Sequence, residues 1–173
     1  SSMLQIVKFF WQICLLRQSP EGLPSTRFST GATFLTYLAI TLGVAAVTRP
    51  DQSLSTVTGT IAIGISLQTG VTFLLLQFKG YRYRFNATWS ALLGANAIML
   101  LILLPLNFII LNSDNNTILM FADSATWVCL GWWLAIAGYI YHKSVEISVF
   151  QGAVIAFLIE FIGVIIAFNL FPR

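Results

Sequence analysis

Residues 149–171 read VFQGAVIAFLIEFIGVIIAFNLF, and this stretch decides the fold class. Its only ionisable side chain is Glu160, and a helix of about 20 mostly apolar residues is long enough to cross a bilayer. Four further apolar stretches precede it, at residues 31–47, 58–78, 87–111 and 125–141. The pattern predicts an all-α integral membrane protein with five transmembrane helices.

The composition excludes a soluble protein. Of the 173 residues, 57% are hydrophobic and 9% are charged, whereas about 25% of the residues of a soluble domain are charged. The net charge is +3, but the nine basic residues are scattered between the apolar stretches. We therefore expect a lipid bilayer as the surroundings and no nucleic acid as a partner.

The N-terminal part precedes the five predicted spans. Residues 1–2 look like a cloning remnant before Met3. Residues 3–17 place three polar side chains on one narrow stripe of a helix and apolar side chains around the rest, which is typical of a helix lying in the membrane interface. The polar residues are Gln5, Lys8 and Gln12, and the predicted interfacial anchor is Phe9, Phe10 and Trp11.

Residues 18–30 contain two prolines and a glycine and are predicted to be a linker. The linker connects the interfacial helix to the bundle of residues 31–173. The helix has two possible uses, namely packing against the bundle and binding a partner.

The orientation follows from the basic residues, which accumulate in short cytoplasmic loops. With the N-terminus inside, seven of them fall on the cytoplasmic side and two on the outer side. The cytoplasmic set is Lys8, Arg17, Arg27, Lys79, Arg82, Arg84 and Lys143, and the outer set is Arg49 and Arg173. The N-terminus is therefore predicted in the cytoplasm and the C-terminus outside.

Glu160 belongs to a face of small side chains on the last predicted helix. Residues three, four, seven or eight positions apart share a helix face, and those around Glu160 are Gly152, Ala153, Ala156, Gly163 and Ala167. Small residues let helices approach closely in a membrane. A second small stripe, Gly131, Ala135 and Gly138, lies on the fourth span and is a candidate surface for a partner helix or a second copy.

The position of Glu160 near the middle of its span predicts partners at the same depth. Gln68 in the second span and Asn96 in the third are the polar candidates. No basic residue lies inside a span, so we expect Glu160 to carry a proton at neutral pH and to donate a hydrogen bond to one of the two amides. Interhelical hydrogen bonding is the favoured role, and a proton or cation pathway is the alternative.

The second span presents a face of polar or small residues that is suited to contact Glu160. Thr60, Gly64, Gln68 and Thr72 follow one another at four-residue steps. In the third span, Pro105 is expected to kink the helix.

The sequence carries none of the usual patterns of enzymes. HExxH, CxxC, GxSxG and the phosphate-binding loop do not occur, so we expect no enzyme, no cofactor and no metal site. Cys14 and Cys129 are too few for a disulfide framework. Both are interpreted as packing residues, with acylation of Cys14 as an alternative.

Two segments resemble the Yip domain family, which is named for its interaction with Ypt/Rab GTPases. They are GYRYRFNATWSALLGANAI at residues 80–98 and WWLAIAGYIYHKSVEISVFQGAVIAFLIE at residues 132–160. The resemblance implies a five-helix bundle with a cytoplasmic N-terminus and no enzymatic activity. The chain is similar to the small bacterial members, which implies the bacterial inner membrane.

These observations lead to two candidate functions. The first is a non-enzymatic adaptor, accessory subunit or membrane-organising factor that binds another membrane protein or a second copy of itself. The alternative is a small transporter or channel that uses Glu160, Gln68 and Asn96 at mid-membrane depth.

Overall fold

The computed structural model describes residues 2–20 and 27–171, and these residues form helices and turns without a strand. The helices are α1 (Ser2–Cys14), α2 (Arg27–Thr48), α3 (Leu54–Lys79), the short 3₁₀ helix η2 (Arg82–Arg84), α4 (Phe85–Asn112), α5 (Asn116–Val145) and α6 (Val149–Leu170). The helices α2 to α6 are long and apolar enough to cross a membrane. The all-α class is confirmed, and so is the presence of five helices long and apolar enough to cross a membrane.

Several predicted boundaries differ from the structure. The interfacial helix, predicted over residues 3–17, ends at Cys14, where the chain turns. Residues 27–30, assigned to the linker, already belong to α2, since no proline or glycine interrupts them. Of the remaining linker residues, 18–20 are described and follow α1, whereas 21–26 lie outside the described part of the chain, as does Ser1 of the predicted remnant.

The fourth span begins at Asn116 and not at residue 125. The Asn115 side-chain oxygen accepts hydrogen bonds from the backbone N–H groups of Thr117 and Ile118, at 2.9 and 3.5 Å. This N-cap starts the helix well before its most apolar part. Asp123, which precedes the predicted stretch 125–141, is an exposed residue of α5.

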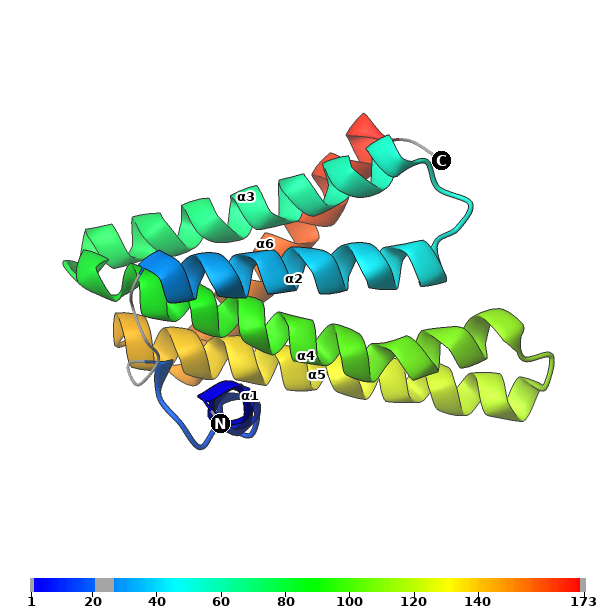
Figure 1. Ribbon diagram of the computed structural model, residues 1–173, viewed down its shortest axis with the longest axis horizontal. Coiled ribbons are helices and arrows are strands. Elements are labelled where there is room, and N and C mark those ends of the chain that lie inside the picture. The colour runs from blue at the N-terminus through cyan, green and yellow to red at the C-terminus, as the bar shows by residue number, and fades with distance from the viewer. Residues whose placement is uncertain (1, 21–26, 172–173) are drawn as a thin grey trace.

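The five long helices run along the molecule, and their connections gather at two ends (Figure 1). We name one the Arg49 end, where the α2–α3 turn, the α4–α5 turn and the last residues of α6 lie. The other is the Arg84 end, where η2 and the α5–α6 turn lie. Helix α6 crosses behind the other helices, and this oblique course determines where the bundle is open.

The crossing of α6 is fixed by contacts near its two ends. Near the Arg84 end, Gly138 of α5 lies against Gly152 of α6, and a Cβ added to Gly138 would be 2.5 Å from the carbonyl oxygen of Val149. Toward the Arg49 end α6 has moved to α3, where the Phe171 ring covers Gly59. The middle of α6, which carries Glu160, therefore lies between two contact regions.

The tight α5–α6 turn brings the two glycines together. Glu146 adopts a left-handed conformation (φ 62°) after α5. Ser148 and Gln151 then form a reciprocal capping box at the start of α6, with N–O distances of 3.0 and 3.1 Å. The predicted small stripes of spans four and five thus meet within one chain at Gly138 and Gly152.

Helix α1 lies across α4 and α5, and Figure 1 shows it nearly end-on. Phe10 is only 8% exposed, because its ring packs on Gly94 of α4. Trp132 Nε1 donates a hydrogen bond to the Cys14 carbonyl oxygen at 2.8 Å. The structure therefore differs from the prediction for Phe10, which faces the bundle, whereas Trp11 is exposed and can still serve as an anchor.

Cys14 is fully buried at the end of α1. Burial disfavours the thiolate and raises the pKa of the thiol to about 12. The side chain is therefore a neutral packing group, and the position does not favour acylation.

Candidate functional site

A polar cavity of about 390 Å³ lies between α2, α3, α4 and α6. The helices leave room for it because α6 makes few contacts with α4, and α2 makes few with α3. Hydroxyl and amide side chains of α3 and of the α2–α3 turn line it, namely Gln52, Thr56, Thr60 and Gln68. The polar or small face predicted on the second span thus lines this cavity through Thr60, Gly64 and Gln68.

Glu160, Gln68 and Asn96 all line this cavity. The three residues predicted to meet at mid-membrane depth are therefore brought together, each from the middle of its own helix. Glu160 is exposed to the cavity and not buried between helices. Gln68 is only 8% exposed.

The predicted hydrogen bond from Glu160 to an amide is not among the contacts of the described residues. Asn96 Nδ2 instead donates to the hydroxyl oxygen of Tyr37 on α2, at 3.3 Å. Helix α6 makes few contacts with α4, the helix that carries Asn96. Glu160 and Gln68 thus present polar atoms to the cavity.

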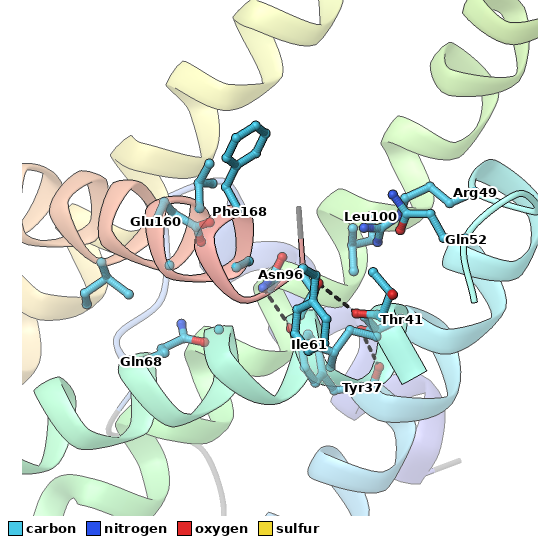
Figure 2. A pocket seen from close by; sticks show the side chains of 18 residues that line it. Tyr37, Thr41, Arg49, Gln52, Ile61, Gln68, Asn96, Leu100, Glu160 and Phe168 are labelled. Atoms are coloured by element: carbon cyan, nitrogen blue, oxygen red, sulfur yellow. Dashed lines mark hydrogen bonds between the residues drawn. The ribbon is translucent and has the colours of Figure 1, made fainter. Parts of the chain in front are cut away.

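A carboxyl group and a guanidinium group mark the two ends of the cavity. Figure 2 shows Glu160 and Gln68 at one end, with Arg49 and Gln52 at the other. Arg49 directly follows α2, so this end lies at the Arg49 end of the bundle. A solute that enters there would pass Arg49 before it reaches Glu160.

A second cavity of about 270 Å³ lies between α4, α5 and α6. Trp127, Cys129 and Trp133 of α5 make it mostly apolar, and Asn96 and Glu160 line it from the other side. These two side chains therefore stand between a polar and an apolar cavity.

A third cavity, of about 10 Å³, lies against Glu160, Gln68 and Tyr141. The Tyr141 hydroxyl is 2.9 Å from the hydroxyl of Thr72, and both residues are buried. Tyr141 is the last residue of the predicted fourth span, residues 125–141. Its ring points into the bundle because of packing between helices, and no pattern in the sequence predicts this direction.

At the Arg84 end, Arg84 joins the α4 start to the α5–α6 turn. Its Nη1 donates to the Ser144 carbonyl oxygen at 3.0 Å and lies 3.8 Å from the Glu146 carboxylate. The Tyr81 hydroxyl also donates to Glu146, and this hydrogen bond raises the pKa of Tyr81. These contacts join the connection between α3 and α4 to the α5–α6 turn.

The residues of the two predicted small-residue stripes, on α5 and α6, lie in different surroundings. Gly138, Gly152 and Ala156 are buried in the α5–α6 contact, and Ala153 lies beside it. Gly163 and Ala167 line the polar cavity. Ala135 is half-buried, and Gly131 is exposed with no atom within 4 Å of an added Cβ.

Metal binding has no support in the described ranges, where histidine, cysteine, aspartate and glutamate side chains form no group of three. Comparison with models of known families, with curated proteins and with solved structures finds no match. The resemblance to the Yip family therefore stays a prediction.

Proposed function

We propose that the chain is a small transporter or channel in which the polar cavity brings a small polar or cationic solute to Glu160. One observation carries the proposal. Glu160 stands exposed in a cavity that it shares with Gln68 and Asn96, and no hydrogen bond holds it among the described residues. A carboxyl kept only to join helices would be hydrogen-bonded to a neighbouring helix.

The chemistry of the cavity supports a solute with hydrogen-bond donors. Glu160 offers two acceptor oxygens when ionised, and the Gln68 and Asn96 amides and the Thr60 hydroxyl add further acceptors. Guanidinium is a suitable test solute, since it is small, permanently charged and rich in N–H donors that match a carboxylate.

The test is uptake of labelled guanidinium into liposomes that contain the purified protein. We expect uptake several-fold above that of protein-free liposomes. In Glu160→Gln it should fall at least tenfold, because the substitution keeps the size of the side chain and removes its charge.

Asp123→Asn is the matched control, since Asp123 is an exposed acidic residue of α5 outside the three cavities. Its uptake should equal that of the wild type. Equal uptake by wild type and Glu160→Gln, or uptake at the level of protein-free liposomes, would contradict the proposal.

A second candidate function is the adaptor or accessory subunit. It is favoured by the outer surface of α1, where Leu4, Val7 and Trp11 are exposed together and could contact another membrane protein. The cytoplasmic N-terminus and the bacterial inner membrane are part of either proposal, and they rest on the basic residues and the family resemblance. Guanidinium uptake at the level of protein-free liposomes would leave the adaptor as the better proposal.

A further inference from the structure

A line of buried polar groups leads from Glu160 toward the Arg84 end. It begins at the cavity of about 10 Å³ that touches Glu160, Gln68 and Tyr141. A cavity of roughly 10–15 Å³ holds one water molecule when two to four polar groups surround it. Three polar side chains border this one, and the buried Gln68 amide has no hydrogen bond to another described residue.

Two pairs of hydroxyl groups follow along the bundle. Tyr141 and Thr72 form the first, with both residues at most 1% exposed. In the second, Thr88 donates to Ser144 at 2.8 Å, and both are equally buried. Tyr141 and Ser144 are one turn apart on α5, and Arg84 contacts the carbonyl oxygen of Ser144.

We propose that protons move between the Glu160 cavity and the Arg84 end along this line, with one water molecule in the small cavity as the link from Glu160 to Tyr141. The inference rests on the proposed function and names the proton as the ion that the Glu160 site handles. Hydroxyl groups and water both donate and accept hydrogen bonds, so each can receive one proton and release another.

The step balances without an oxidant or a reductant. The Glu160 carboxyl gives its proton to the water, and the water gives one of its own to the Tyr141 oxygen. The Tyr141 proton then passes to Thr72, and Thr72 releases its own hydroxyl proton toward the Thr88–Ser144 pair. That pair releases a proton in turn to solvent at the Arg84 end. Only O–H bonds form and break, and Glu160 is recharged with a proton from solvent at the Arg49 end.

Glu160 is the one carboxyl group in this line. The ionisable side chains that line cavities with it are Tyr37 from α2, Tyr141 and Cys129 from α5, and Arg49 after α2. Near pH 7 a tyrosine side chain stays neutral and an arginine side chain stays positively charged. The cavity residues Gln68 of α3 and Asn96 of α4 do not titrate.

The test is proton uptake by liposomes that contain the protein and a trapped pH-sensitive dye, with valinomycin and potassium to set the voltage. Tyr141→Phe keeps the ring and removes the hydroxyl, so we expect the rate to fall at least tenfold. Thr72→Val removes the other hydroxyl of the pair and should act in the same direction. Tyr139→Phe is the control, since Tyr139 is on the same helix outside the three cavities.

Guanidinium uptake separates this inference from the proposed function. We expect Tyr141→Phe and Thr72→Val to leave that uptake unchanged. Guanidinium uptake that depends on Glu160, together with a proton rate no higher than in protein-free liposomes, would overturn the proton path and leave the proposed function. If the wild type shows neither guanidinium uptake nor proton uptake above that of protein-free liposomes, the proton path and the proposed function are both overturned.

A purely structural role of the hydroxyl pair predicts a different result. Tyr141→Phe would then lower the melting temperature and leave the proton rate unchanged, which would overturn the inference. If Tyr141→Phe does not fold, the rate of Thr72→Val decides in its place.

Discussion

Gly138→Leu is expected to destabilise the bundle more than any other single substitution considered for this chain. At Gly138 the backbones of α5 and α6 touch, and an added Cβ would lie 2.5 Å from the Val149 carbonyl oxygen and 3.0 Å from the Ala153 nitrogen. These are backbone atoms, so no side chain can rotate away. Overpacking a close contact typically costs about 1–3 kcal/mol, and more where the backbone must move.

The measurement is thermal unfolding of purified protein in a mild detergent. A cost of about 3 kcal/mol corresponds to a melting temperature lower by about 6–12 °C in a domain of this size. Gly131→Leu on the same helix is the matched control, because an added Cβ at Gly131 meets no atom within 4 Å. Equal melting temperatures of the two variants would contradict the described α5–α6 contact.

Gly163→Leu is expected to abolish guanidinium uptake while the fold is kept. Gly163 lines the polar cavity on the same helix as Glu160. An added Cβ would meet the Leu67 Cδ1 atom at 3.6 Å, an ordinary contact, and the rest of the leucine would fill the cavity. We expect uptake at least tenfold lower and a melting temperature close to that of the wild type.

Gly43→Leu on α2 controls for the added apolar bulk. Gly43 is exposed, lies outside the cavities and has no atom within 4 Å of an added Cβ. Its uptake should match that of the wild type. Full uptake by a folded Gly163→Leu protein would mean that the solute does not pass through this cavity.

The five spans could be predicted because their signal is local. A run of about 20 apolar residues interrupted by polar turns needs no knowledge of tertiary contacts. The start of α5 was missed because an N-cap at Asn115 can begin a helix in a polar segment. The apolar pattern marks the part of the helix suited to the bilayer and not its ends.

The candidate site could be predicted in part. Helical spacing and depth selected Glu160, Gln68 and Asn96, and all three line one cavity. The same spacing suggested a closed, hydrogen-bonded interface, whereas the structure has an open one. The difference comes from the angle of α6, which depends on distant contacts at Gly138 and Phe171.

The hydroxyl pairs and Arg49 could not be selected from the sequence. Tyr141 meets Thr72 across 69 positions of the chain, and Thr88 meets Ser144 across 56. Threonine and serine are common in membrane helices, and their spacing within one helix does not reveal a partner on another. Such contacts follow from helix packing alone.

The central claim is that the Glu160 cavity opens to solvent at the Arg49 end. Its most direct test is the reaction of Gln68→Cys with a small, charged, membrane-impermeant thiol reagent, in a chain in which alanine replaces Cys14 and Cys129. Gln68 lines the inner part of the cavity and Thr72 lies one turn beyond it, fully buried. We predict that Gln68→Cys reacts from the Arg49 side of sealed vesicles only, and that Thr72→Cys reacts from neither side. A Gln68→Cys protein that stays unreactive from the Arg49 side, or reacts equally from the Arg84 side, would contradict the account.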